Sequence, residues 1–266
     1  MKKILVISML LVTLVACQPS DEECAQSLVV EAQTLVDNGH WQQARVVLDS
    51  LHATYPREVT QRRLAKALSD SIIYLEAQQT MAYVDTLLPP LLEQADQLIK
   101  RFKYEKNDKY EDYGKYVHRL LATNKNTARN FIQAYVLDNR QTIVKSYYYG
   151  SKQMNQQSVT ISAGEESDIF YGSNYHFQEG AHYEIMTLDN EKSLSLLNFV
   201  NTHNGVRIRV EGMGDKSTHN WVYYLNDHEK EALSETYRLG CLMKDINRLE
   251  QMQRVAHAQV LRYGSK

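Results

Sequence analysis

The sequence is poor in residues that interrupt regular structure, with only 11 glycines and 4 prolines among 266 residues. This scarcity excludes a collagen-like chain and argues against a long disordered one. The net charge of −2 gives no basic excess, so we expect no nucleic-acid partner. The length suits one large domain or two small ones.

The sequence also lacks the common signatures of catalysis. It has no phosphate-binding P-loop, no H-E-x-x-H pair, no G-x-S-x-G motif and no EF-hand loop. Neighbouring acidic residues such as Glu165 and Glu166 fall in a turn signal, where carboxylates are usually solvated, so no acid or base can be assigned. We therefore expect a protein that is not an enzyme and that holds no cofactor.

One short segment has residue types that could bind a metal. His176, Gln178, His182 and Glu184 would point to one face of an extended chain, and imidazole and carboxylate groups are zinc ligands. Gly180 predicts a bend that would spoil this alternation. We expect exposed strand or loop histidines and no metal site.

No apolar run is long enough for a permanent membrane span. The run Ile4–Ala16 has 13 residues, whereas a transmembrane helix needs about 20. It follows Lys2 and Lys3 and ends in a small residue, which is typical of a cleaved signal peptide over residues 1–16.

The residues after this run resemble those of a bacterial lipoprotein. Leu14-Val15-Ala16-Cys17 resembles the lipobox, which implies cleavage before Cys17, a diacylglyceryl group on its thiol, acylation of its amine and attachment to a membrane. The alternative is an ordinary secretory signal in which Cys17 is incidental. Gln18–Glu23 ("QPSDEE") resembles the acidic export signal of Bacteroidota surface lipoproteins, which implies the outer face of the outer membrane. The alternatives are a solvated acidic tether over residues 17–24 and an anchor that faces the periplasm.

Cys24 and Cys241 are the other two cysteines. An oxidising envelope permits a disulfide between them, but nothing in the sequence pins them together. We expect two unpaired thiols.

Residues 25–106 have helical periodicity and predict a helical domain. Its start resembles one tetratricopeptide repeat, with a break at Asn38-Gly39 and a stop at Pro56; the matching residues are Gly39, Trp41, Ala44, Leu48, Leu51 and Pro56. A lone hairpin must bury its apolar face elsewhere, and we expect a helix over residues 59–88, ended by Pro89-Pro90, to cover it. A further amphipathic helix is predicted over residues 91–106.

The rest of the chain predicts an α+β fold. Residues 107–129 read as a charged, Tyr-rich junction, and residues 130–226 alternate with period two, which predicts an antiparallel β domain with one inserted helix over residues 190–203. Residues 227–263 predict a long C-terminal helix that packs back on the helical part, with Asn226 and Glu229 at capping-box spacing.

Tyrosine is abundant, with 18 against 5 phenylalanines. Tyr147, Tyr148 and Tyr149 form the densest cluster, and Tyr223 and Tyr224 are candidates to join it. Such a cluster could form a stacking platform for sugar rings, and these five are the candidate ligand-binding residues. The alternative is the alternation of core and surface residues in ordinary strands.

The chain as a whole resembles uncharacterised lipoproteins of Bacteroides-type bacteria, chiefly over Leu48–Gln79 and Phe102–Arg140. The resemblance implies an envelope location and no known activity. We expect a lipid-anchored envelope protein that binds a protein partner through its helical part. The alternative is a surface glycan-binding module that uses tyrosines of the β domain.

Overall fold

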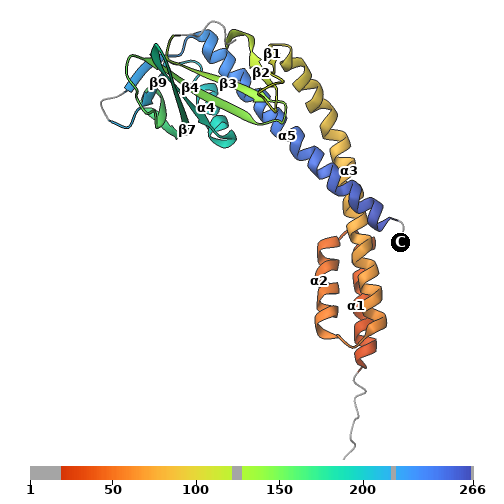
Figure 1. Cartoon of the computed structure of the whole chain (residues 1–266). Coiled ribbons are helices and arrows are strands. Elements are labelled where there is room, and N and C mark those ends of the chain that lie inside the picture. The colour runs from red at the N-terminus through yellow and green to blue at the C-terminus, as the bar shows by residue number, and fades with distance from the viewer. Residues whose placement is uncertain (1–18, 122–127, 217–219, 265–266) are drawn as a thin grey trace, which may run out of the picture. The chain divides into compact units, whose positions relative to one another are not determined.

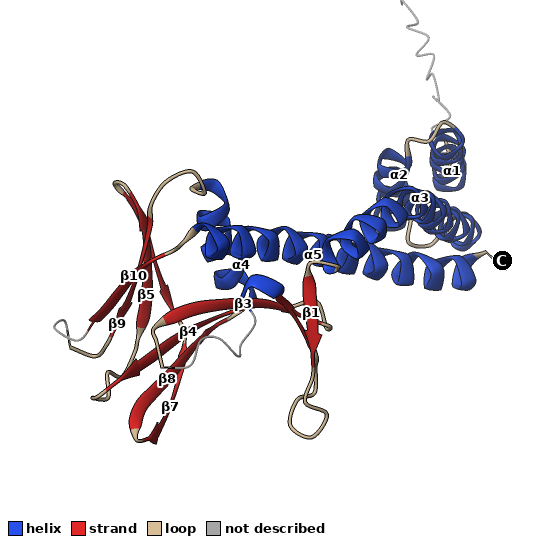
Figure 2. Cartoon of the chain, turned by 90° about the horizontal axis from the view of Figure 1, so that it is seen from above, coloured by secondary structure: helices blue, strands red, loops and turns tan. Residues whose placement is uncertain are grey.

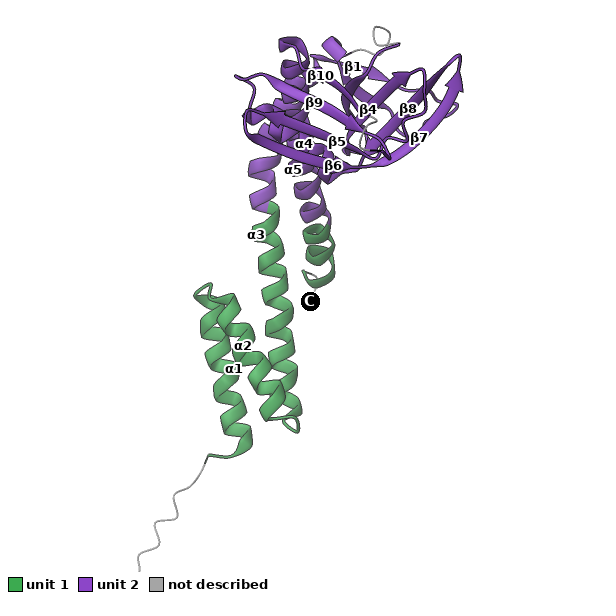
Figure 3. Ribbon diagram, turned by 90° about the vertical axis from the view of Figure 1, so that its left-hand side faces the viewer, with its two compact units in different colours: residues 1–81, 255–266 green, residues 82–254 purple. Residues whose placement is uncertain are grey.

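The computed structural model describes residues 19–121, 128–216 and 220–264. These residues form α-helices and two antiparallel sheets, so the predicted α+β class is confirmed (Figure 1). The chain divides into two compact units, one of residues 1–81 and 255–266 and one of residues 82–254 (Figure 3). Cys17 and the predicted signal peptide lie outside the described residues. None of the described helices is both long and apolar enough to cross a membrane.

The first unit contains a helical hairpin of α1 (Asp21–Asp37) and α2 (Trp41–Thr54), covered by the first part of α3 (Val59–Ile99). Gly39 makes the turn with a φ of +76°, which a residue without Cβ adopts at little cost. Small residues let the helices approach closely, and Ala32, Ala44 and Ala65 are fully buried between them. The prediction that the next helix covers the hairpin is therefore confirmed.

Helix α1 begins earlier than the sequence interpretation placed it. Ser20 is its N-cap and forms a capping box with Glu23, in which each side chain bonds the other residue's backbone N–H. Asp21, Glu22 and Glu23 occupy the first turn, where negative charge interacts favourably with the helix dipole. The acidic residues assigned to a tether are thus part of a helix.

Helix α3 continues through Pro89 and Pro90, so the predicted stop there is wrong. The two prolines remove two backbone donors from the helix. Packing on both sides compensates for this loss, because Val84 before them and Ala95 after them are buried.

The second unit contains a six-stranded sheet in the order β1-β2-β3-β4-β8-β7, in which all neighbouring strands are antiparallel (Figure 2). Its strands are β1 (Phe102–Glu105), β2 (Lys115–His118), β3 (Phe131–Leu137), β4 (Thr142–Gly150), β7 (Ser173–Glu179) and β8 (Ala181–Leu188). A short 3₁₀ turn, η1 (Arg119–Leu121), follows β2.

A four-stranded sheet has the order β10-β9-β5-β6. It is built from β5 (Ser158–Ala163), β6 (Glu166–Tyr171), β9 (Ile208–Met213) and β10 (Asn220–Tyr224). Helix α4 (Asn190–Thr202), capped by Asp189, is the inserted helix that was predicted. The main core joins side chains of both sheets with α4 residues such as Leu196 and α5 residues such as Leu233.

Helix α5 (Asp227–Tyr263) is the predicted C-terminal helix, and Asn226 and Glu229 form the expected capping box. Within the second unit it packs against the end of α3, where Leu239 of α5 and Leu98 of α3 share a small core with Phe102. The buried His118 of β2 lies 2.8 Å from the carboxylate of Glu235 on α5, which ties the sheet to this helix.

Two strands lie where the sequence did not place them. Strand β1 falls in a segment predicted as helix, and β2 falls in the predicted junction. Both β1 and β2 have only 4 residues, which is too short for period two to stand out. Burial of Phe102 beneath α5 decides the conformation of β1.

Candidate functional site

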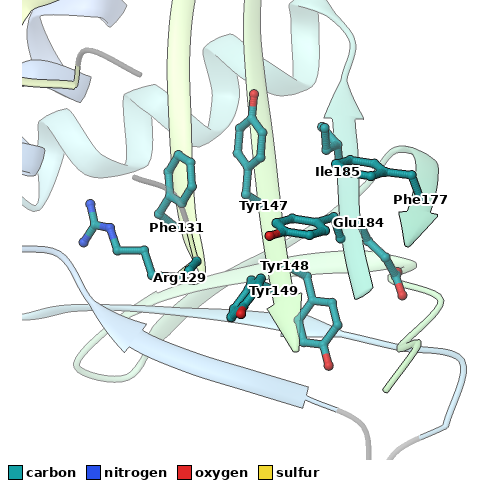
Figure 4. Close-up of a pocket in the computed structure, with 10 residues that line it drawn as sticks. Arg129, Phe131, Tyr147, Tyr148, Tyr149, Phe177, Glu184 and Ile185 are labelled. Atoms are coloured by element: carbon teal, nitrogen blue, oxygen red, sulfur yellow. The ribbon is translucent and has the colours of Figure 1, made fainter. Parts of the chain in front are cut away.

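Strand β4 places its three consecutive tyrosines on alternate faces of the six-stranded sheet, as the two-residue period of a strand requires. Tyr148 packs against the main core. Tyr147 and Tyr149 therefore project from the opposite face, which we call the outer face. Figure 4 shows the Tyr147 and Tyr148 side chains pointing in opposite directions.

Strand register brings further aromatic residues to this outer face. Tyr147 is the partner of Phe131 on β3 and of Ile185 on β8. Two residues along β4, Tyr149 is the partner of Tyr183, which in turn is opposite Phe177 on β7. Two adjacent cross-strand rows of large apolar side chains result.

A cavity of about 180 Å³ opens at these two rows (Figure 4). Apart from Ala128, the residues that line it have large side chains and belong to β3, β4, β7 and β8 or come just before β3. These are Arg129, Phe131, Tyr147, Tyr148, Tyr149, Phe177, Tyr183, Glu184 and Ile185. Apolar surface dominates the lining, which favours a ligand that has an apolar face.

The rings around the cavity contact one another. Phe131 and Tyr147 stack with centroids 4.5 Å apart, and Phe177 and Tyr183 stack at 4.8 Å. Tyr149 contacts Tyr183 at 5.1 Å with its plane tilted by 57°. These contacts hold the rings in place, so the cavity is formed before any ligand arrives.

A few polar groups accompany the rings. The Tyr147 hydroxyl donates a hydrogen bond of 3.2 Å to Gln133 Oε1, and burial raises the pKa of Tyr147 to about 12, which keeps the phenol protonated. The Arg129 guanidinium lies 5.5 Å from the centre of the Phe131 ring and 3.3 Å from the Glu229 carboxylate. Apart from Glu184, the polar side chains among the described residues that line the cavity are thus those of tyrosines and Arg129.

Glu184 borders the cavity, but both oxygens of its carboxylate accept hydrogen bonds from other parts of the protein. It is completely buried and accepts hydrogen bonds from the backbone N–H groups of Gln156, Met154 and Asn155 and from the Asn174 side chain. Burial alone would raise the pKa of Glu184, but these four hydrogen bonds outweigh it and lower the pKa. Glu184 therefore secures the segment before β5 and does not face the cavity with a free oxygen.

Tyr223 and Tyr224 on β10 lie apart from this site. Tyr223 packs against the main core, where its hydroxyl oxygen accepts a hydrogen bond of 3.0 Å from the Ile132 N–H. Tyr224 is exposed on the other face of β10, with the Arg207 guanidinium 3.6 Å from its ring centre. The five tyrosines proposed from the sequence do not form one surface, and only the three of β4 line the cavity.

The segment with possible metal ligands forms the hairpin of β7 and β8. Gly180, with a φ of +72°, is its turn, so His176 and Glu184 become register partners and share a face with His182. The bend predicted at Gly180 is present, but it closes a hairpin and therefore keeps these side chains on one face instead of separating them. Nε2 of His176 lies 3.0 Å from Nδ1 of His182. In the part of the chain that the structure describes, no three His, Cys, Asp or Glu residues are grouped to hold a metal.

Comparison with known proteins gives no information on this site. A scan against models of protein families, a search of curated proteins and a search of solved structures found no match to this chain.

Sequence reasoning missed the partners that complete the cavity. Phe131, Phe177 and Tyr183 come from three strands other than β4. Their only signal is the apolar residue at alternate positions of each strand, and that pattern does not say which strands are neighbours. The two described cysteines, Cys24 and Cys241, are free thiols, as expected, and neither lines the cavity.

Proposed function

We propose that this protein is a non-catalytic, lipid-anchored binding protein of the bacterial cell envelope, and that its β domain binds a glycan. One observation carries the proposal: rings from three adjacent strands, Tyr149, Tyr183 and Phe177, line a cavity on an outer sheet face. Aromatic rings offer flat apolar faces, and the apolar face of a sugar ring is a suitable partner for them. Phenol hydroxyls add hydrogen-bonding capacity.

The size of the cavity limits what it encloses. Its volume of about 180 Å³ is below the roughly 300–1,000 Å³ of pockets that enclose drug-sized ligands. The cavity suits one ring of a larger molecule, with the remainder lying over the neighbouring part of β8 and β7, where Tyr175 is exposed. A glycan chain meets that requirement, because it presents one ring after another.

A protein partner on the helical part is less well supported by the geometry. An apolar groove between helices would favour it. Half of the residues that line the hollow beside α2 and α3 in the first unit are charged, namely Asp49, Arg62, Arg63, Lys66 and Asp70. A protein partner on the helices remains the second candidate function.

The membrane attachment is proposed on the sequence signal alone. A diacylglyceryl group on Cys17 and a third acyl chain on its amine would anchor the protein durably, since each buried CH₂ adds about 0.8 kcal/mol. Protease treatment of intact cells tests the location, with Cys17→Ala as the control. An acylated and cleaved wild type supports an outer-membrane protein at the cell surface, and acylation with protection indicates an anchor that faces the periplasm. Release of both the wild type and Cys17→Ala as soluble protein without acylation would contradict the lipid anchor.

Glycan binding is tested with the purified chain lacking residues 1–16 on a printed glycan array and then by calorimetry. We expect Tyr149→Ala and Tyr183→Ala each to weaken binding at least tenfold, about 1.4 kcal/mol. Tyr224→Ala is the matched control, because Tyr224 is also an exposed tyrosine but lies on the other sheet. Absence of binding to any glycan, or equal loss in all three variants, would refute the proposal.

A further inference from the structure

The outer face of the six-stranded sheet changes character beyond the aromatic cavity. Next to Tyr147 along β4 on this face is Lys145, whose register partners are Gln133 on β3 and Thr187 on β8. A row of polar residues therefore lies directly beside the aromatic rows. Gln133 is buried in it and is bonded to the Leu121 carbonyl and the Tyr147 hydroxyl, whereas Lys145 and Thr187 are half-buried. Successive rows on one face are about 6.7 Å apart, so a ligand that extends from the cavity past Tyr147 reaches this polar row.

Two lysine ammonium groups meet on this part of the face. Lys145 Nζ and Lys115 Nζ each lie 5.8 Å from the centre of the Tyr135 ring. Lys115 is paired with the Glu111 carboxylate at 3.0 Å. Among residues 19–121, 128–216 and 220–264, no carboxylate lies within ion-pair distance of Lys145.

The environment of Lys145 makes its charge costly. Burial lowers the pKa of the Lys145 ammonium, the neighbouring Lys115 lowers it further, and Glu111 partly offsets this. A half-buried cation beside a second cation is stabilised when an anion binds to it. The unliganded protein thus holds a positive group that an anionic ligand would neutralise.

We infer that the glycan is acidic, and that a carboxylate or sulfate on the sugar next to the one in the aromatic cavity binds Lys145. This inference rests on the proposed glycan-binding function and adds the charge class of the ligand. The aromatic rows contact the face of one ring, and the Lys145 row selects for negative charge on its neighbour. Lys115 adds positive potential, but its own partner Glu111 leaves Lys145 as the principal contact.

The test compares wild type with Lys145→Gln and Lys145→Arg on an array that carries neutral, uronate-containing and sulfated oligosaccharides. Lys244→Gln, an exposed lysine on α5, is the matched control. Urea unfolding of each variant checks that the fold is kept. We expect wild type to bind acidic glycans, with about tenfold weaker binding in Lys145→Gln and unchanged binding in Lys244→Gln. We also expect Lys145→Arg to retain binding, and added salt to weaken binding to wild type.

The outcomes separate the two proposals. Binding of neutral glycans alone, or equal affinity of wild type and Lys145→Gln for acidic glycans, would overturn the assignment of Lys145 and leave the aromatic site standing. Loss of binding in Tyr149→Ala with full binding in Lys145→Gln would also overturn the assignment of Lys145 and support the aromatic site. If wild type binds no glycan, neutral or acidic, both the proposed function and this inference fail.

Discussion

Glu184 is the buried group whose removal has the most definite consequence. Its Oε1 accepts hydrogen bonds from the N–H groups of Met154 (2.6 Å) and Asn155 (2.8 Å), and its Oε2 accepts from Gln156 N–H (2.5 Å) and Asn174 Nδ2 (2.8 Å). In Glu184→Gln an NH₂ group replaces one of the two carboxylate oxygens. Because each oxygen accepts two hydrogen bonds, the new NH₂ group faces two N–H donors in either orientation, and both donors lose their acceptor. Each buried donor left unsatisfied costs about 1–3 kcal/mol, so we expect a loss of about 4 kcal/mol. That is a large share of the roughly 5–15 kcal/mol that stabilises a typical protein.

The measurement uses tryptophan fluorescence during urea unfolding. The two tryptophans, Trp41 and Trp221, lie in different units, so Trp41→Phe leaves Trp221 as a reporter of the second unit alone. Glu179→Gln makes the same chemical change at an exposed position of β7 and should alter stability by less than about 0.5 kcal/mol. If Glu184→Gln unfolds within about 1 kcal/mol of wild type, the hydrogen bonds to Glu184 do not carry the stability that we assign to them.

The same carboxylate predicts a dependence of stability on pH. The pKa of Glu184 is lower in the folded protein than in the unfolded chain, where it is about 4.3. Its contribution is therefore complete above the unfolded pKa and is lost as the pH falls through the folded pKa. The stability difference between wild type and Glu184→Gln should be constant from about pH 6 upward and shrink below about pH 4. A constant difference down to pH 2 would contradict the lowered pKa.

Two further substitutions test the packing of β10 and its neighbour β9. Tyr223→Phe leaves the Ile132 N–H without its acceptor at 3.0 Å, so we expect a loss of about 1–3 kcal/mol by urea unfolding with unchanged glycan binding. Weaker binding at unchanged stability would instead place Tyr223 in the site. Gly212→Ala puts a Cβ in steric overlap with Nε1 of the Trp221 ring, so we expect a destabilisation of about 1–3 kcal/mol and altered Trp221 emission. Unchanged stability and emission would mean that no such close contact exists.

Features with a short-range signal were predictable from the sequence. The capping residues Asp189 and Asn226 lie one residue before α4 and α5, because a side-chain oxygen at that position satisfies free N–H groups of the first turn. Ser20 and Glu23 have the same capping-box spacing. That signal is present in the sequence, but the acidic residues around it also resemble an export signal.

Other features depend on contacts that the sequence does not encode locally. Strand β1 follows directly after α3, and a helix over both was the simplest interpretation of the residues around Phe102. The chain changes to a strand because Phe102 is buried with Val136 of β3 and Leu239 of α5, which are far away in the sequence. Pro89 and Pro90 are the opposite case: the local signal predicts a break, but the helix continues between the buried Val84 and Ala95.

The candidate site combines both kinds of information. The run Tyr147–Tyr149 was visible in the sequence, and strand alternation requires that its middle member face the opposite way from the other two. Which face is outside follows only from the core, where Tyr148 packs with buried residues of both sheets. Tyr223 and Tyr224 alternate in the same way on β10 of the four-stranded sheet, where Tyr223 faces the core and Tyr224 is exposed. Consecutive tyrosines in a strand therefore cannot all contribute to one surface. The other residues of the surface are set by strand order, which here places Tyr183 and Phe177 beside Tyr149. Lys145 lies further along β4 on the same face, next to Tyr147.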